Sequence, residues 1–537
     1  MTEEPFIVSG TIAAGSQYTA DAGVHILRQG GNAVDAAVAA AFASFIAEVG
    51  VVHLGGSGLA QIFDPATRQG VVYDFFSNTP GLGQTSPPDS LDFAEVTIDF
   101  GPTTQNFHLG RGSVAVPGNI FGLCQMAADY GRLPLATLLD PAIELAQNGV
   151  ILEQFQAETC QLLAPLYTHT EEMRQVFAPG GKLIQGGERL FIPHLAETLR
   201  KLAREGEGLL RNGKLAQALV ADQVQYGGLL TLSDLKAYPT PRADAIRLPY
   251  HDLEVLLPPP SSTGGPLVAF SLKLLSAFQV GEFPHGSADH LRLLVEVMAA
   301  TSRARPQWDR WLDELPPGRA VAAFLDAGFM QPYLEEVMAA FRGRQPSQLV
   351  EEAGGPANTS HLSVIDSDGL AVSLTTTAGE SAGYVVPGTG FIPNNIMGEE
   401  DLHPAGFHSK PPGVRIPSMM TPAVVLQDGL VRLVLGSGGS KRIRSAIVQV
   451  LSNLLDFRLP LAQAVNLPRV HLEDGVVQCE GGTDKAAMDD LARLGYPLNR
   501  WGQRSIYFGG AHSVSRTPEG RLVGAGDNRR GGAVAAS

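Results

Sequence analysis

The 537-residue sequence predicts a mixed α+β protein that forms either several domains or one large multilayer domain. The chain is longer than one ordinary hydrophobic core can serve. Helical periodicity fills much of the chain before residue 358, and strand patterns are denser after it. With 44% hydrophobic and 17% charged residues, the composition is typical of a globular protein.

The hydrophobic pattern gives each expected element its limits. Asn32 is expected to cap a helix that begins at residue 33, with Asp35 favourably placed in its first turn. Other helices are expected at residues 16–29, 124–130, 135–147, 192–205, 214–226, 267–278, 288–303 and 334–341. Strands are expected at residues 6–15, 59–63, 70–76, 253–257, 432–435, 476–480, 505–508, 511–515 and 522–525. Residues 82–106 lack a pattern and are expected to form a surface excursion.

Charge argues against two classes of partner. The net charge of −15 opposes binding to nucleic-acid phosphates and to anionic membranes, so small molecules are the expected partners. Three scattered cysteines, Cys124, Cys160 and Cys479, have the spacing of neither a disulfide framework nor a zinc site. We therefore expect no metal and no cofactor.

Two segments bear on location. The first residues are acidic and no apolar stretch follows them, which predicts a cytoplasmic protein without a secretory signal. Residues 33–52 approach the length of a membrane span, but they contain Asp35 and Glu48 and are rich in alanine. A buried, closely packed helix is the better interpretation.

The most informative stretch begins at Thr359. Apolar residues alternate along 359–366 and 370–377, and a turn at 367–369 joins the two, which predicts paired strands with Thr359 at the start of one of them. A threonine hydroxyl needs a base to become a nucleophile. The residue's own α-amine, with a pKa near about 8, can be that base once the peptide bond before Thr359 has been cut. The alternative is a β-branched residue that simply opens a strand. His361 is expected to be packed or hydrogen-bonded on the side of Ser363, rather than to act as a base or metal ligand.

Two further segments frame this stretch. Residues 342–358 are polar and contain Gly and Pro, which predicts an exposed linker that would move away once the chain is cut before Thr359. The Gly-rich segment 54–58 predicts a close backbone approach at the start of a strand. A phosphate-binding loop is the competing interpretation, but the spacing of a P-loop is missing.

Ten short blocks, in order, carry a resemblance to a known family. In the first half they are residues 30–38, 55–58, 116–118, 130–131 with 141–142, 227–231 and 259–262; in the second they are 359–366, 394–395, 420–422 and 436–439. Together the blocks resemble the γ-glutamyltransferase (glutathione hydrolase) family of N-terminal nucleophile hydrolases over nearly the whole chain.

The resemblance implies a four-layer αββα sandwich made as one precursor. The precursor would cut itself between Asn358 and Thr359, leaving a large subunit 1–358 and a small subunit 359–537 that stay associated. Thr359 would be the nucleophile, and Thr377 would support it. Backbone N–H groups of the 436–440 loop, at Gly438 and Gly439, would stabilise the oxyanion.

The substrate pocket implied by the resemblance departs from the family pattern. Phe76 stands where the family has an arginine that holds the α-carboxylate of the γ-glutamyl group. Glu399 aligns with the aspartate that binds the α-amino group, and Ile396 replaces a Gln or Glu. Met419 follows Ser418, where the family has a second serine.

The same alignment places Asn395, Ser418 and Ser440 beside the substrate, together with Glu399 and Phe76. Another arginine is needed if a carboxylate is to be bound. Arg111, Arg415 and Arg442 are the candidates that the sequence offers.

Three functions remain open from the sequence. The first is a γ-glutamyltransferase or glutathione hydrolase that forms an acyl-enzyme on Thr359. The second is an amidohydrolase with another acyl group, similar to oxamate amidohydrolases or cephalosporin acylases; Phe76, Ile396 and Met419 favour it, because apolar residues replace charge-pairing ones. The third is an uncleaved binding protein, against which the intact Asn-Thr-Ser-His at 358–361 argues.

Overall fold

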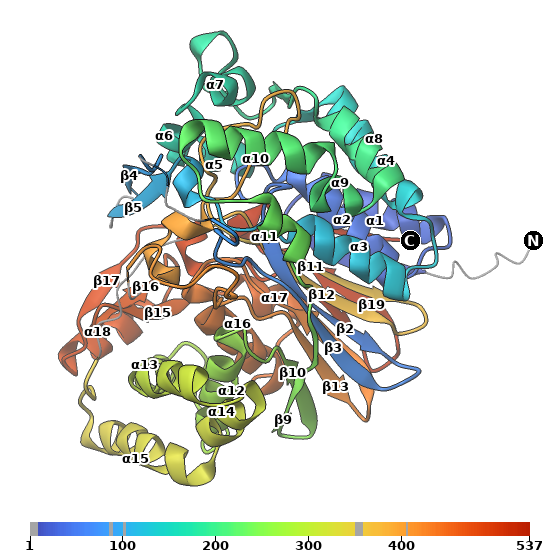
Figure 1. Cartoon of the computed structure of the whole chain (residues 1–537). Coiled ribbons are helices and arrows are strands. Elements are labelled where there is room, and N and C mark those ends of the chain that lie inside the picture. Colours follow the sequence, from blue (N-terminus) through green and yellow to red (C-terminus); the bar gives the residue numbers. More distant parts are fainter. Residues whose placement is uncertain (1–8, 85–87, 89, 100–103, 350–357, 404–405) are drawn as a thin grey trace, which may run out of the picture.

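Two antiparallel sheets lie face to face in the middle of the molecule and helices cover both outer faces, in a computed structural model that describes residues 9–84, 88, 90–99, 104–349, 358–403 and 406–537 (Figure 1). The predicted four-layer αββα sandwich is confirmed. Strands with one apolar face toward helices and the other toward a second sheet explain why almost every residue of the central strands is buried.

The first sheet has seven strands in the order β20-β1-β11-β12-β2-β3-β8. Its strands are β20 (Ala533–Ala536), β1 (Gly10–Ala14), β11 (Ser360–Asp366), β12 (Ala371–Thr377), β2 (Ser57–Asp64), β3 (Gln69–Phe75) and β8 (Arg242–Asp244). The hairpin of β11 and β12 that the sequence predicts is therefore at the centre of this sheet. Gly369, with φ +87°, supplies the left-handed turn between the two strands.

The second sheet has six strands in the order β19-β18-β14-β13-β10-β9. These strands are β19 (Leu522–Ala525), β18 (Ser513–Arg516), β14 (Leu430–Leu435), β13 (Ala423–Gln427), β10 (Leu253–Leu257) and β9 (Ile246–Tyr250). Smaller pairings lie outside the sandwich: β15 (Val470–Glu473) with β16 (Val476–Cys479) and β17 (Leu498–Arg500), β4 (Ala94–Asp99) with β5 (Thr104–Leu109), and β6 (Val150–Ile151) with β7 (Arg189–Leu190).

One helical layer covers the first sheet. It contains α1 (Gln17–Arg28), α2 (Ala33–Ala47), α3 (Asn119–Tyr130), α4 (Leu135–Asn148), α5 (Gln154–Leu162), α6 (Ala164–Tyr167), α7 (Glu171–Phe177), α8 (Leu195–Glu205), α9 (Gly208–Arg211), α10 (Lys214–Tyr226) and α11 (Leu232–Ala237). Asn32 caps α2 in a reciprocal capping box with Asp35, and all fifteen residues of α2 are buried. Both the predicted cap and the predicted buried helix are confirmed.

The other helical layer covers the second sheet. It contains α12 (Gly264–Leu275), α13 (Ala288–Glu314), α14 (Pro317–Phe324), α15 (Ala327–Gly343), α16 (Arg442–Leu455), α17 (Leu461–Asn466) and α18 (Lys485–Arg493). Helix α13 continues past the predicted end at residue 303 and through Pro306. Among the described residues, no helix is both long enough and apolar enough to cross a membrane.

The layer between the sheets is partly polar. A small apolar cluster, which includes Ile365 and Ala371, fills its outer part. Nearer the start of β11, His361 and Ser363 face the second sheet, as their alternation with Leu362 and Val364 predicts. Polar side chains between two sheets need partners, and these are supplied from both sheets.

Two expectations about secondary structure are wrong. Residues 505–508, expected to be a strand, contain the 3₁₀ turn Ile506–Phe508, with Ser505 accepting a hydrogen bond from the Tyr507 amide. The segment 82–106 contains strand β4 and the start of β5, so it is not wholly irregular. Of the predicted linker 342–358, residues 342–343 end helix α15 (Ala327–Gly343), and residues 350–357, like the first eight residues of the chain, lie outside the described part.

Candidate active site

Side chains from two separate segments, the end of β12 with the turn that follows it and the turn near Arg530, hold the backbone at Asn358 and Thr359. The register of β11 with β12 pairs Ser360 with Thr376, which brings Thr377 opposite Thr359. The Thr377 hydroxyl donates to the carbonyl oxygen of Asn358 at 2.5 Å. The Asn358 N–H donates to a carboxyl oxygen of Glu380 at 2.8 Å, and Arg530 donates to the carbonyl oxygen of Thr359 at 3.1 Å.

The glycine loop predicted to bind the oxyanion passes directly beside Thr359. A Cβ atom added to Gly438 would lie 2.0 Å from the carbonyl oxygen of Thr359, so only glycine fits there. The Gly438 N–H donates to the carbonyl oxygen of Gly510 at 3.2 Å, which occupies that donor. Gly439 has φ +121°, a conformation that favours glycine. The loop thus passes beside Thr359, and the N–H of Gly438, one of the two amides predicted to bind the oxyanion, is already paired.

The His361 side chain packs against this loop at Gly436. Its ring nitrogens lie 2.8 Å from the Thr375 hydroxyl and 3.0 Å from the Ser363 hydroxyl. A Cβ atom added to Gly436 would lie 2.4 Å from the imidazole ring, so the loop rests on the histidine. Burial lowers the pKa of His361 well below its usual value, and a neutral imidazole packed in this way is a structural support.

Two of the side chains around Thr359 are buried ionisable groups. Burial raises the pKa of Glu380 to about 8, even though the Asn358 N–H and Arg530 act in the opposite direction. Burial, together with the charge of Arg442, lowers the pKa of Arg530 to about 10. At neutral pH, a mostly protonated Glu380 and a charged Arg530 therefore flank the Asn358–Thr359 peptide.

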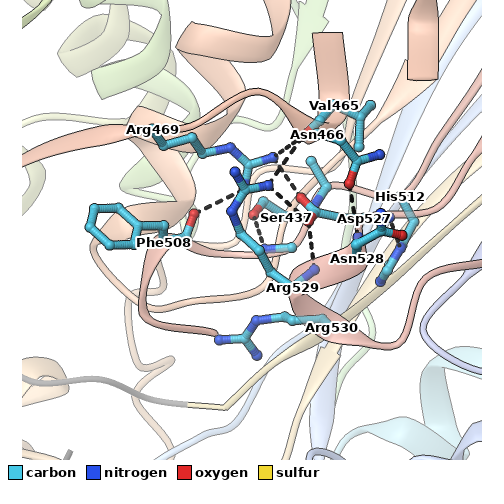
Figure 2. Close-up of polar contacts among 12 residues, drawn as sticks. Ser437, Val465, Asn466, Arg469, Phe508, His512, Asp527, Asn528, Arg529 and Arg530 are labelled. Atoms are coloured by element: carbon cyan, nitrogen blue, oxygen red, sulfur yellow. Dashed lines mark hydrogen bonds and ion pairs between the residues drawn. The ribbon is translucent and has the colours of Figure 1, made fainter. Parts of the chain in front are cut away.

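A cluster of ionic groups near the end of the chain positions Arg530 (Figure 2). The Asp527 carboxylate accepts from Arg469 at 2.6 Å and from Arg529 at 3.0 Å. Arg529 also donates to Glu480 at 2.7 Å. Although burial opposes ionisation, the two arginines hold the pKa of Asp527 well below its usual value. Paired charges that are fully buried fix the turn that carries Arg530.

A second buried acid, Glu48, lies beside Ser360, the residue that follows Thr359. The Glu48 carboxyl group, at the end of α2, accepts hydrogen bonds from the hydroxyls of Thr19 and Ser360. Burial raises the pKa of Glu48 to about 7. This contact ties the start of β11 to the outer helical layer.

Thr359 and Thr377 line a cavity of about 220 Å³. Apolar side chains make up much of its wall: Phe76, Leu312, Leu402, Met419, Met420 and Ile443. Phe76 is fixed through its backbone, because its N–H donates to Asp74 at 3.0 Å and its carbonyl accepts from the Tyr238 hydroxyl at 2.7 Å. An apolar ring therefore occupies the position where the family resemblance led us to look for an arginine.

Charged groups in the cavity wall mostly face groups of opposite sign. The Arg305 guanidinium lies 3.5 Å from Asp309, and the Lys441 ammonium lies 3.5 Å from Asp401. Lys410 is half-buried, and burial lowers its pKa while Asp313 and Asp309 raise it. The wall is thus close to charge balance.

Glu399 also lines the cavity. Its Oε1 atom is buried and has no hydrogen-bond partner among the described residues. Burial raises its pKa well above the usual value, and the nearby Glu380 and Asp401 add to the effect. A neutral carboxyl group with an open oxygen can accept a hydrogen bond from a substrate donor.

Of the other predicted substrate residues, two line the cavity and one does not. Ser418 and Ser440 line the cavity, and the Ser440 hydroxyl donates to Asp401 at 2.9 Å. Asn395 is buried but is not part of the wall; its side-chain oxygen accepts from the N–H groups of Glu380 and Ser381. Asn395 therefore shapes the turn after β12.

None of the three candidate arginines lines the cavity. Arg111 binds Asp222 at 3.0 Å, far from Thr359 in the fold, and lines a separate surface depression. Arg415 donates to Tyr238 at 2.8 Å, and Arg442 donates to the carbonyl oxygen of Tyr507 at 3.1 Å. Arg305, which the sequence analysis did not consider, is the arginine in the wall.

Within the described ranges, no group of three or more His, Cys, Asp or Glu side chains is arranged to hold a metal ion. The three cysteines are free thiols.

Comparison with known proteins agrees with this geometry. The family model described as gamma-glutamyltranspeptidase matches residues 19–537. The chain belongs to the γ-glutamyltranspeptidase family. Within it, the chain is 33% identical over 522 residues to the Acylase ACY 1 proenzyme of Pseudomonas sp. (strain SE83), covering 96% of this chain and 91% of that protein. It is 30% identical over 543 residues to the glutathione hydrolase proenzyme of Pseudomonas aeruginosa, covering 96% and 94%.

Solved structures support the same fold. The cephalosporin acylase from Bacillus halodurans superposes with a TM-score of 0.83 and 24% identity, covering 100% of this chain and 98% of that one. The gamma-glutamyltranspeptidase of Helicobacter pylori gives a TM-score of 0.52 and 24% identity, covering 60% and 89%. The protein is thus a γ-glutamyltranspeptidase-family enzyme with the N-terminal nucleophile hydrolase fold.

The sequence analysis missed Glu380, Arg530 and Arg305. A weak signal existed for the first two: Glu380 is a lone acid in the small-residue segment 378–383, and Arg530 precedes a Gly-Gly pair. Single charges in such segments more often lie at the surface, so the pattern alone did not indicate burial.

Proposed function

We propose that this enzyme cuts itself between Asn358 and Thr359 and then hydrolyses a small-molecule amide through an acyl-enzyme on Thr359. The observation that carries the proposal is the hydrogen bond from the Thr377 hydroxyl to the carbonyl oxygen of Asn358, next to a buried Thr359. A donor on a carbonyl oxygen stabilises the negative charge that grows there when a nucleophile attacks the carbon.

Self-cleavage needs only groups of this chain and one water molecule. The Thr359 hydroxyl oxygen bonds to the carbonyl carbon of Asn358, the carbon–nitrogen bond breaks, and the amine of Thr359 takes up the hydroxyl proton. Water then hydrolyses the ester and releases the Asn358 carboxylate. The products are chains 1–358 and 359–537, which remain associated.

In the processed enzyme, the freed α-amine of Thr359 takes the proton of its own hydroxyl as that oxygen attacks the substrate amide. The amine passes the proton to the leaving nitrogen, and water later releases the acyl group as an acid. The N–H of Gly439 is the donor that we assign to the oxyanion in this reaction.

For the acyl group, we favour one that is not γ-glutamyl. Phe76, Met419 and the other apolar side chains of the wall suit a hydrocarbon portion, and the cations of the wall already face carboxylates. The similarity to a proenzyme named as an acylase is consistent with this choice.

A γ-glutamyl group is the second candidate, favoured by Glu399. Glu399 lines the cavity, and its carboxyl group is the acceptor there that we assign to the α-amino group of a γ-glutamyl substrate. The similarity to glutathione hydrolase proenzymes supports this alternative.

Two measurements test the proposal. Intact-mass analysis of the purified protein should find two chains that meet at Asn358–Thr359, whereas Thr359→Ala should remain one inactive chain and Thr359→Ser should process slowly. A processed, active Thr359→Ala protein would refute the reaction. A panel of aliphatic, aromatic and γ-glutamyl anilides should then show higher kcat/KM for the neutral acyl groups; a preference for the γ-glutamyl anilide would select the second candidate.

A further inference from the structure

The polar contacts at Asn358 are made by two ends of one short turn. The Thr377 hydroxyl binds the Asn358 carbonyl oxygen, and the Glu380 carboxyl group binds the Asn358 N–H. The turn between them is rigid, because the Gly379 N–H donates to Thr377 at 3.0 Å and Asn395 holds the Glu380 N–H at 2.7 Å. Asn358 is therefore held at both its N–H and its C=O.

We propose that Glu380 is a positioning residue for self-cleavage, and that its neutral form holds the Asn358 carbonyl within reach of the Thr359 hydroxyl. This inference rests on the self-cleavage proposed above and assigns it a residue that the family resemblance did not supply. Asn358 is held at its N–H on one side of its Cα atom and at its C=O on the other, which restricts rotation about its φ and ψ bonds and keeps the carbonyl near the Thr359 hydroxyl. A fixed attack geometry contributes strongly to rate.

The surroundings of the second carboxyl oxygen of Glu380 explain why self-cleavage should require the protonated form of this side chain. The Oε2 atom is buried without a partner among the described residues. An ionised carboxyl group there would place a negative charge next to the oxyanion that forms on Asn358, and two like charges in a buried site repel strongly. A protonated carboxyl group keeps the hydrogen bond to the Asn358 N–H and adds no charge.

The ionisable groups around Glu380 come from several elements. Arg530 and Arg442 lower its pKa, and Glu399 lies close enough to interact with it. On the side of the first sheet, the Tyr167 hydroxyl donates to the Glu380 carbonyl at 3.4 Å, and His53 interacts with the Glu380 backbone.

Most of these neighbours keep one charge state near neutral pH. Burial raises the pKa of Tyr167 well above its usual value and lowers that of His53 to about 3, so both stay neutral. Burial lowers the pKa of Arg530 only to about 10, and it stays charged up to pH 9. Glu380, with a pKa of about 8, is then the acid expected to change charge between pH 7 and 9, and Glu399, whose pKa burial also raises, is the second acid to be tested.

The direction of the pH effect follows from these charges. Below pH 8, Glu380 is mostly protonated and self-cleavage is fast. As the pH rises through 8, Glu380 ionises and self-cleavage slows. A glutamine at 380 can still accept from the Asn358 N–H but cannot ionise, so it should remove this alkaline loss of rate.

The experiment follows maturation of full-length precursor made by cell-free synthesis and chased at pH 6 to 9. A denaturing gel and intact mass give the fraction cut at Asn358–Thr359. The variants are Glu380→Gln, Glu380→Ala and, as the matched control for the second acid, Glu399→Gln. Thermal melting of each variant, made with Thr359→Ala so that it stays uncut, reports whether the precursor folds.

We expect the natural precursor to mature at least about fivefold more slowly at pH 9 than at pH 7. Glu380→Gln should stay within about threefold of the natural rate at pH 7 and should be flat to pH 9, while Glu380→Ala should be at least about tenfold slower at pH 7 because Asn358 loses its acceptor. Glu399→Gln should keep the alkaline loss.

Three results would overturn the inference. One is a folded Glu380→Ala precursor that matures at the natural rate, another is an unchanged alkaline loss in Glu380→Gln, and the third is disappearance of that loss in Glu399→Gln alone. If Glu380→Ala fails to fold, the pH profile of Glu380→Gln decides by itself. A natural protein that never cuts at Asn358–Thr359 would refute the proposed function as well, so the two failures are distinguishable.

Discussion

The two sides of Thr359 are built in different ways. On the side of β12 and the chain terminus, the Asn358 N–H, the Asn358 carbonyl oxygen and the Thr359 carbonyl oxygen each have a specific partner, and an added Cβ atom at Gly438 would collide with Thr359. On the other side lies a cavity with an apolar ring, Phe76, and charges that face one another. The first side fixes one reacting group, whereas the second leaves space for an acyl group.

In the reaction that we propose, bond cleavage and substrate choice are therefore carried by separate elements. Cleavage groups come from the central strands β11 and β12 and from the glycine and C-terminal turns beside them. The cavity wall comes from Phe76 at the end of β3, from helix α13 and from the loops around residues 399–420. Substitutions on the first side should therefore abolish activity, and those on the second should redirect it.

The largest effect is expected for Gly438→Ala. Its Cβ atom would lie 2.0 Å from the Thr359 carbonyl oxygen, so the backbone of the nucleophile must shift. A shift of Thr359 also moves the Asn358 carbonyl oxygen away from the Thr377 hydroxyl. Because loss of one oxyanion contact costs on the order of a hundredfold or more in rate, we expect at least that reduction in self-cleavage, measured by gel and intact mass.

Gly502→Ala is the matched control, since nothing lies within 4 Å of its added Cβ atom. It should mature at the natural rate. A Gly438→Ala protein that matured as fast as the control would mean that the cleavage side tolerates movement, and the contrast between the two sides would fail.

A smaller effect, a gain in activity toward a γ-glutamyl substrate, is expected for Phe76→Arg. An arginine in the wall could bind the carboxylate of a γ-glutamyl anilide, and such a charged hydrogen bond contributes roughly 1.5 to 3 kcal/mol. We expect kcat/KM for this substrate to rise about tenfold, while Phe76→Leu, which keeps the wall apolar, should bring no gain. Efficient γ-glutamyl hydrolysis by the natural enzyme, without improvement in Phe76→Arg, would contradict our interpretation of the wall.

The smallest effect is expected for Lys410→Met. Lys410 faces Asp309 and Asp313, and a neutral acyl group has no charge for it to bind. We expect kcat/KM for the preferred neutral anilide to change less than about threefold. A loss of more than tenfold would show that the wall recognises an anionic acyl group, and the assay should then be repeated with acyl groups that end in a carboxylate.

The sequence predicted the local framework around Thr359 and several residues of the cavity wall, but it missed contacts that depend on the tertiary fold on both sides. Local patterns were enough for the β11–β12 hairpin and for the Asn32 cap, since alternation and capping act between residues close in the chain. The 505–508 segment was predicted wrongly because its apolar residues mimic a strand, while the Ser505 cap and Gly509, at φ +82°, close a turn there.

Part of the cavity wall was missed for a physical reason. Helix α13 runs past residue 303, and the extension carries Arg305, Asp309, Leu312 and Asp313, all of which line the cavity. Pro306 lies within this extension, and a proline usually marks the end of a helix in sequence. Glu380 and Arg530 were missed because burial of a charge depends on partners that lie outside the local pattern: Asn358 is 22 residues from Glu380, and Thr359 is 171 residues from Arg530.

The order of strands in the two sheets determines how firmly the two chains of a processed enzyme would stay associated. In the first sheet, β1 pairs on both sides with strands that follow Thr359, and β12 pairs with β2 from the part before it; in the second sheet, β13 pairs with β10. After a cut at Asn358–Thr359, the backbone hydrogen bonds of both sheets would still hold the two chains together. Neither chain could dissociate without unfolding both sheets. The two chains of the mature enzyme should therefore stay associated on dilution, because dissociation requires unfolding. After denaturation, activity should return at a rate that depends on protein concentration, because two chains must meet to refold.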